Sequence, residues 1–472
     1  MRYRLTALNT AHIHIYCLCA LLFFSCASTS NKQKWIEQSN RDSEEYFVGF
    51  AEVEKRGKRQ DYINEAHDLA FSNIAKSIKA NVEVSSNRKV KELEKLGIEN
   101  TYILEKRFEA MSSVRSKMTL DRVENVSEGT EGRIYYVYKR LSIKKYDELL
   151  TNRIHKAVQS ALLDYQTGIE LNDTDPVGAM GYFFSGYRNL VPYQDQILVV
   201  NNPNGANTKL NIDIELKAVL KEMINNFEFQ AVQSDYIGKI GQPLDNKLTA
   251  IVQYRYGPDN NKSTGNVPIR FSFDTGKGDL VASSLTDDGG KAVSNVSKIK
   301  SLLADQKVKA TIDLQSFVGQ DDIGLAIIDE FRQYNLPAVY FSISLEPITI
   351  FLDVDEKIFG NPSNQNVIAP ILMKSLEKHL GAIFVKKKRG SDYVIQAEVD
   401  TKKLGEFYGV VTASADINIY LKKGRKTLVT ESVTGINGTQ STYEGAARAA
   451  LKKLAIKIEE ETAKNIALQF LN

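Results

Sequence analysis

Residues 248–256 read Leu-Thr-Ala-Ile-Val-Gln-Tyr-Arg-Tyr, and residues 267–273 read Val-Pro-Ile-Arg-Phe-Ser-Phe. In both stretches, and again in residues 308–314, apolar and polar side chains alternate, which is typical of a strand with one buried face. Segments rich in glycine and aspartate, such as residues 285–292, separate the strands and predict turns. Short strands spaced by turns predict an antiparallel β-sandwich over residues 240–345.

The turn Leu285-Thr-Asp-Asp-Gly-Gly-Lys-Ala292 resembles the turn that joins two strands in bacterial immunoglobulin-like (Ig-like) domains of the adhesin and cell-wall type. The resemblance implies a spacer or a module that binds carbohydrate or protein. Acidic side chains in these turns offer oxygen ligands for Ca²⁺, but turn formation explains them more simply. We therefore predict no metal site here. The acidic residues concerned are Asp274, Asp279, Asp287 and Asp288.

Two apolar stripes at helical spacing flank the segment Asn172-Asp-Thr-Asp-Pro176. Asp175 is a suitable N-cap, and Pro176 suits the first position of the second helix. These features predict a helical hairpin over residues 151–200. A connecting segment follows over residues 201–239.

The stretch 45–150 combines strand and helix patterns. Residues 46–53 predict a strand, and the run from Ile63 to Ile78 predicts an amphipathic helix. Small residues on one face of that helix, Ala66 and Ala70, would let it lie close to a sheet. Three further strands are predicted at Val82 with Val84, at residues 114–120 and at residues 134–141.

Several of these features together resemble the LPP20 family of bacterial outer-membrane lipoproteins: Trp35, the strand with Gly49, the Ala66/Ala70 helix, the Val82–Val84 segment and the closing residues Tyr135–Leu141. The resemblance implies an α/β sandwich similar to the N-terminal fold of the flagellar-assembly protein FlgT. That fold has no known active site, so the resemblance implies a binding or scaffolding role.

Residues 346–472 predict a second α/β sandwich. A helix ends at Gly381, three alternating strands follow, and a capping box at Ser441–Glu444 begins a final alanine-rich helix. This pattern resembles the α/β domains of envelope lipoproteins that assist secretion or cell-wall synthesis, such as CsgG and LpoB. The basic run Lys386–Arg389 is suited to anionic lipid or polymer, or is a solvated turn. The whole chain is therefore predicted to be a multidomain α+β protein.

The N-terminus has the features of a secretory signal peptide over residues 1–25: Arg2 and Arg4, no acidic residue before Glu37, and an apolar run from Ile13 to Phe24. That run is short for a bilayer span. Its end, Ser25-Cys26, resembles a bacterial lipoprotein signal, which implies that Cys26 is the lipid attachment site and carries acyl chains such as palmitate. An ordinary cleaved signal peptide is the alternative.

Polar residues 26–44 then form a lipidated tether, and we expect the protein on the outer membrane, facing the periplasm. The formal net charge of the whole chain is only +3, which disfavours a nucleic-acid partner. The expected partners are the membrane, through the N-terminal lipid, and an envelope protein or a cell-wall polymer.

No catalytic residue or cofactor is predicted. The only cysteines in the sequence are Cys17, Cys19 and Cys26, which excludes a disulfide framework or thiolate zinc site in the body of the chain. Motifs for a nucleophile elbow, a phosphate-binding loop or a zinc protease are absent from the sequence. Two carboxylate pairs remain: Asp173 with Asp175 begins a helix, and Asp353 with Asp355 closes a strand.

We therefore predict a non-enzymatic, lipid-anchored envelope protein that acts as a scaffold or assembly factor and positions a partner-binding domain in the periplasm. Two alternatives stay open. One is a cell-wall or polysaccharide-binding protein that acts through the Ig-like domain, and the other is a glycan hydrolase.

Overall fold

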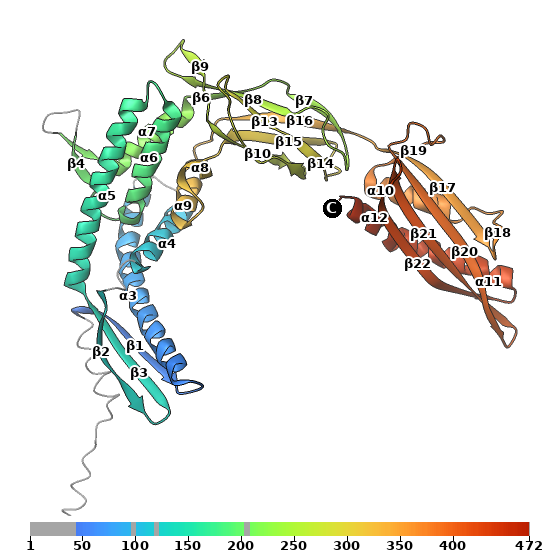
Figure 1. Cartoon of the computed structure of the whole chain (residues 1–472), viewed down its shortest axis with the longest axis horizontal. Coiled ribbons are helices and arrows are strands. Elements are labelled where there is room, and N and C mark those ends of the chain that lie inside the picture. The colour runs from blue at the N-terminus through green and yellow to red at the C-terminus, as the bar shows by residue number, and fades with distance from the viewer. Residues whose placement is uncertain (1–43, 96–100, 118–121, 203–207, 472) are drawn as a thin grey trace, which may run out of the picture. The chain divides into compact units, whose positions relative to one another are not determined.

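A computed structural model describes residues 44–95, 101–117, 122–202 and 208–471 (Figure 1). The chain is a multidomain α+β protein. It forms two compact units. Among the described residues, the first unit includes those of 44–171, 179–220 and 318–331, and the second includes those of 172–178, 221–317 and 332–471. Cys26, the predicted signal peptide, nearly all of the tether and Trp35 lie outside the described residues.

The N-terminal part of the first unit is a small antiparallel sheet of order β1-β3-β2. A long helix, α3, packs on this sheet through residues that are fully buried at Ala66, Ala70, Ile74 and Ile78. Gly49 of β1 faces Ala70 closely, as the small residues predict. The bounds are β1 Tyr46–Glu54, α3 Arg59–Lys95, α4 Thr101–Lys117, β2 Glu124–Glu131 and β3 Ile134–Ser142.

Two of the expected strands in this part are helices. Val82 and Val84 lie in α3, and residues 114–117 end α4, while residues 118–121 are outside the described part. Val82 is buried and continues the four-residue spacing of Ile74 and Ile78, whereas Val84 is exposed. The prediction failed because two apolar residues two positions apart are too short a pattern to distinguish a strand from a helix, in which they point to different sides.

The rest of the first unit is mostly helical and includes the two-stranded sheet β4-β5, whereas α8 belongs to the second unit except for its last residue, Val318. The helices on either side of Asn172–Pro176 are present, and the Asp175 carboxylate accepts a hydrogen bond of 2.9 Å from the Gly178 N–H. The bounds are α5 Ile143–Leu171, α6 Pro176–Leu190, η2 Val191–Tyr193, β4 Val199–Asn201, β5 Lys209–Asn211, α7 Ile212–Asn225, α8 Gln315–Val318 and α9 Asp322–Arg332. Residues 318–331 belong to this unit although they lie between two strands of the sandwich in sequence.

A buried charge cluster holds α9 within the first unit. The Glu330 carboxylate lies 2.7 Å from Arg107 Nη2 and 2.6 Å from Lys217 Nζ. Tyr187 Oη donates a 2.8 Å hydrogen bond to its other oxygen. Burial, and then the charge of Glu330, raise the pKa of Tyr187 well above its ordinary value, so the phenol keeps the proton that it donates.

In the second unit, β11 and β14 form a two-stranded sheet, and the other strands of residues 227–312 and 338–346 form two larger sheets that pack as a sandwich (Figure 1). One has the order β12-β10-β15-β16-β7, and the other has the order β13-β8-β6 with β9 beside β8. The bounds are β6 Phe227–Ala231, β7 Asp235–Lys239, β8 Leu248–Arg255, β9 Asn261–Ser263, β10 Pro268–Thr275, β11 Gly278–Leu280, β12 Ser283–Leu285, β13 Lys291–Ser294, β14 Val296–Ile299, β15 Asp305–Ile312 and β16 Ala338–Glu346.

The C-terminal domain is a sheet of order β18-β17-β20-β21-β22, with β19 also beside β17 and three helices over its apolar face. β17 and β20 are parallel, and the later strands are antiparallel. Gly381, at φ 60°, ends α10 as predicted. The bounds are β17 Thr349–Ile358, β18 Asn361–Pro362, α10 Ile368–Leu380, β19 Ile383–Phe384, β20 Tyr393–Phe407, β21 Val410–Lys423, β22 Lys426–Gln440, α11 Tyr443–Lys457, η3 Ile458–Thr462 and α12 Ala463–Leu471.

Two local predictions in this domain were wrong. The N-cap of α11 is Thr442 rather than Ser441, because the Thr442 side chain accepts the hydrogen bond from the Gly445 N–H. Asp353 and Asp355 lie inside β17 and do not close it. None of the helices in the described part of the chain combines the length and the apolar character that a bilayer crossing requires.

Candidate functional site

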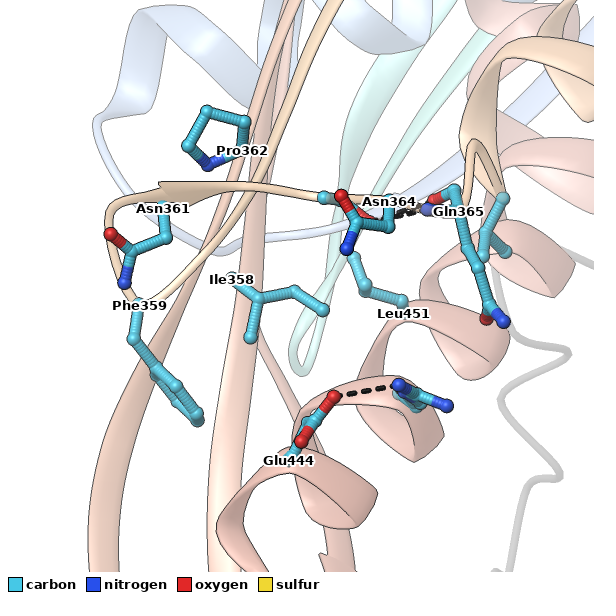
Figure 2. Close-up of a pocket in the computed structure, with 11 residues that line it drawn as sticks. Ile358, Phe359, Asn361, Pro362, Asn364, Gln365, Glu444 and Leu451 are labelled. Atoms are coloured by element: carbon cyan, nitrogen blue, oxygen red, sulfur yellow. Dashed lines mark hydrogen bonds and ion pairs between the residues drawn. The ribbon is translucent and has the colours of Figure 1, made fainter.

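A cavity of about 300 Å³ opens in the C-terminal domain between a loop and a helix (Figure 2). The loop runs from Ile358 to Val367 and includes the short strand β18. The helix is α11, which contributes Glu444, Arg448 and Leu451 to the opposite wall. The cavity therefore has one wall of loop residues and one wall on a regular helix.

Hydrogen bonds from β20 fix the start of this loop. Phe359 and Gly360 have positive φ angles of 53° and 80°, and such a conformation is costly for a residue that carries a side chain. The Phe359 N–H donates to Thr401 Oγ1 at 3.1 Å, and the Gly360 N–H donates to Asp400 Oδ1 at 3.0 Å. These two hydrogen bonds fix the turn at the start of the loop that lines the cavity opposite α11.

A buried glutamate fixes the end of the loop. Glu356 is only 5% exposed, and its Oε2 accepts hydrogen bonds from the Val367 and Ile368 N–H groups at 3.0 and 3.1 Å. These N–H groups lie at the start of α10, where a helix leaves donors without partners and favours negative charge. The loop is thus fastened at both ends.

The cavity combines planar polar groups with an apolar surface. Asn361, Asn364 and Gln365 each offer an amide donor next to an amide acceptor. Opposite them, Arg448 Nη2 and Glu444 Oε1 form an ion pair of 2.6 Å (Figure 2). Ile358 and Leu451 supply apolar contact between the two polar sets. This arrangement suits a small ligand that has both hydroxyl groups and C–H faces.

Aromatic side chains adjoin the cavity. The rings of Phe359 and Tyr443 meet edge to face at 6.5 Å, and Lys403 Nζ lies 5.2 and 5.1 Å from their centres. Because these residues come from three separate elements, they link the cavity loop and α11 to strand β20.

Strands β20 and β21 continue from this point into a hairpin with an apolar tip. Phe407 and Tyr408 are 76% and 91% exposed, and Leu404 and Val410 beside them are also exposed. Tyr408 and Gly409 have positive φ angles of 49° and 71°, as the two-residue turns of β-hairpins require. A contiguous apolar patch on a surface is commonly a contact site.

The sandwich has a second, shallower cavity of about 430 Å³. Its lining includes Phe273, Lys277 and Asp279. Asp279 already pairs with Lys300 at 2.9 Å, so fewer polar groups there remain for a ligand than in the C-terminal cavity.

The residues weighed as sites from the sequence are not brought together. Cys26 is outside the described residues. Asp175 caps α6, and Asp355 pairs with Lys357 at 2.6 Å. Asp287 accepts hydrogen bonds from the N–H groups of Gly289 and Lys291, which is turn formation. In the part of the chain that the structure describes, no three His, Cys, Asp or Glu residues are placed to hold a metal ion.

Sequence reasoning missed the C-terminal cavity. The available signal was the polar stretch Asn361-Pro-Ser-Asn-Gln365 between a strand and a helix, which marks a loop. Nothing in that stretch predicts that α11, about eighty residues later in the sequence, lies across from it.

Comparison with known proteins identifies no family. No family model and no curated protein match the chain. Among solved structures, the hypothetical protein CT253 of Chlamydia trachomatis is 8% identical, with a TM-score of 0.20, over 26% of this chain and 98% of its own. A protein of Caulobacter crescentus CB15 described as a lipoprotein is 12% identical, with a TM-score of 0.16, over 25% of this chain and 87% of its own. The tandem Ig repeats of Dlar are 8% identical, with a TM-score of 0.14, over 44% of this chain and 95% of their own. Likenesses at this level identify neither a fold family nor a function.

Proposed function

We propose that the protein is a non-enzymatic, lipid-anchored cell-envelope scaffold or assembly factor that holds its C-terminal domain in the periplasm for a protein partner. The observation that carries this proposal is the apolar tip of the β20–β21 hairpin. Phe407 and Tyr408 stand almost fully in water, where large aromatic surfaces gain free energy on being covered. Aromatic anchors beside a polar rim are typical of protein interfaces.

Photo-crosslinking in intact cells tests this role of the hairpin. With a photoactivatable amino acid in place of Tyr408, we expect one discrete crosslinked partner, and we expect Phe407→Ser to remove it. Tyr182 on α6, which is 42% exposed, provides the control position in the first unit. Crosslinks of equal yield and pattern at Tyr182 would argue against a partner site at the hairpin.

The anchor is tested at Cys26. We expect Cys26→Ser to move the protein from the membrane fraction to the soluble fraction and to abolish labelling by a palmitate analogue, because acyl chains supply about 0.8 kcal/mol per buried methylene. The matched control is Cys19→Ser, which removes a thiol within the predicted signal peptide. A Cys26→Ser protein that stays labelled and membrane-bound would contradict the lipid anchor.

A specific observation favours a second candidate, a protein that binds cell-wall polysaccharide. The amides of Asn361, Asn364 and Gln365 and the Glu444–Arg448 pair surround an apolar surface, as recognition of a sugar ring requires. We therefore propose the C-terminal cavity, rather than the Ig-like sandwich, as the place where such a polymer binds.

Retention on insoluble cell wall at moderate salt tests this candidate. We expect Asn364→Ala combined with Gln365→Ala to lower retention about tenfold, the effect of losing about 1.4 kcal/mol of binding. The control is Gln60→Ala with Asn64→Ala, a pair of the same residue types exposed on α3. Deletion of residues 240–345 is unsuitable, because it also removes Glu330 and exposes the cations that this residue pairs with. Equal retention of both double variants would exclude the cavity.

A further inference from the structure

Two basic segments that are far apart in sequence lie at the same end of the C-terminal sheet. The first is the run Lys386-Lys-Lys-Arg389 in the loop between β19 and β20. The second is Lys422-Lys-Gly-Arg-Lys426 at the turn between β21 and β22. We call these the basic loop and the basic turn.

Strand register brings the two segments together. β20 begins at Tyr393, just after the basic loop, and its second residue Val394 pairs with Lys422. Lys423 pairs with Lys426 across the basic turn, and its Nζ lies 5.6 Å from the Tyr393 ring centre. The cavity and the hairpin tip lie at the other end of these strands, since Phe407 pairs with Val410 there.

The cations at this end are not neutralised within the protein. Lys386, Lys387, Lys388 and Arg389 are exposed, as are Lys423, Arg425 and Lys426, and none of them forms an ion pair in the described part of the chain. The acid next to the basic loop, Asp392, is engaged by Lys239 Nζ at 3.1 Å and by the Thr349 N–H at 2.8 Å. Like charges crowded together repel one another, so an anionic partner would relieve this repulsion.

The shape and chemistry of this end fit a flat anionic surface. The cations lie on a loop and a turn that project from the sheet end, and exposed Ile383 and Leu428 flank them, at 53% and 39% exposure. Basic residues with a few apolar neighbours are typical of surfaces that rest on anionic lipid. The Tyr393 ring is only 1% exposed, so it is not available for nucleic-acid bases to stack on.

We propose that the basic loop and the basic turn together form a docking surface for an anionic lipid membrane. This surface lies on the C-terminal domain and is separate from the acyl anchor proposed at Cys26. It gives the domain a second, electrostatic contact with a membrane, and that contact weakens as salt rises.

Vesicle binding by the full chain carrying Cys26→Ser tests the proposal without a lipid anchor. The vesicles contain phosphatidylcholine alone or phosphatidylcholine mixed with phosphatidylglycerol. We expect at least about tenfold tighter binding to the mixed vesicles at low salt, because each cation near an anionic surface contributes about fivefold, and we expect the preference to fall with salt. The apolar run at the N-terminus is the same in every variant and so cancels from the comparison.

Three charge variants locate the contact. One changes Lys386, Lys387, Lys388 and Arg389 to Gln, and another changes Lys423, Arg425 and Lys426 to Gln. We expect each to reduce the preference for anionic vesicles about tenfold or more, and the combination to abolish it. The matched control changes Lys55, Arg56 and Lys58 to Gln, which removes two lysines and one arginine from an exposed turn of the first unit.

The result that supports the proposal is loss of the preference in the basic-loop and basic-turn variants while the control keeps it. Equal loss in the control would overturn the proposal, because net charge alone would then explain binding. Equal binding to vesicles with and without phosphatidylglycerol at low salt would also overturn it, because the surface would then not recognise anionic lipid. Because no acyl chain is present, either outcome is independent of the proposed anchor.

Discussion

Replacing Glu330 by alanine should lower the free energy of unfolding of the first unit by about 3–5 kcal/mol, the usual effect of removing one partner of a buried ion pair. Glu330 is 1% exposed and contacts Arg107, Lys217 and Tyr187. Without the Glu330 carboxylate, the buried Arg107 guanidinium and the Lys217 ammonium group lose the anion that both of them contact. The measurement is urea denaturation combined with hydrogen exchange of the α9 amides, because a multidomain chain need not unfold in one step.

Two further variants separate the buried charge from simple loss of a side chain. Glu148→Ala removes an exposed carboxylate from α5 in the same unit and should change stability by no more than about 0.5 kcal/mol. Arg107→Leu added to Glu330→Ala should recover part of the loss, since it removes the stranded cation. If Glu330→Ala costs no more than Glu148→Ala, the charge cluster does not hold α9.

Alanine at Gly49 or at Gly438 should destabilise the corresponding domain by about 2–3 kcal/mol, as overpacking does in a dense core. A Cβ at Gly49 would collide with the Ala70 carbonyl and lie 2.8 Å from Ile74 Cγ1. A Cβ at Gly438 would collide with the backbone of α11 and lie 2.8 Å from the Ala449 carbonyl carbon. Both helices would have to move away from their sheets, which exposes apolar surface on the alanine faces.

Gly405 in β20 is the matched control for this prediction. It is also a strand glycine without positive φ, but a Cβ there meets no atom within 4 Å. Gly405→Ala should therefore be neutral or slightly stabilising, because alanine reduces the freedom of the unfolded chain. The thermal midpoints of the three variants check this difference. Equal midpoints for all three would show that the close helix–sheet approach is not needed.

Local features of this fold followed from the sequence because they depend on neighbouring residues. Asp175 and Pro176 placed the start of α6, and Gly381 placed the end of α10. Alternation predicted β8, β10 and β15. Alternation failed at Val82. The pair Val82 and Val84 predicted a strand, but Val82 continues the four-residue spacing of Ile74 and Ile78 on one face of α3.

The candidate sites followed from the sequence much less well. The basic run Lys386–Arg389 was visible, but its meeting with Lys422–Lys426 depends on how β20 pairs with β21. The amides of the cavity were not singled out, since Asn361–Gln365 reads only as a loop until α11 lies across from it.

The sequence by itself determined where α6 begins and α10 ends, the alternation of β8, β10 and β15, and the small-residue faces that can approach a sheet. Only the tertiary structure decided that α9 joins the first unit. Glu330 of α9 makes this contact by accepting a hydrogen bond from Tyr187, which is 143 residues earlier in the sequence. The physical reason is range. Periodicity and capping act within a few residues, whereas strand register and buried ion pairs join residues whose separation leaves no local pattern.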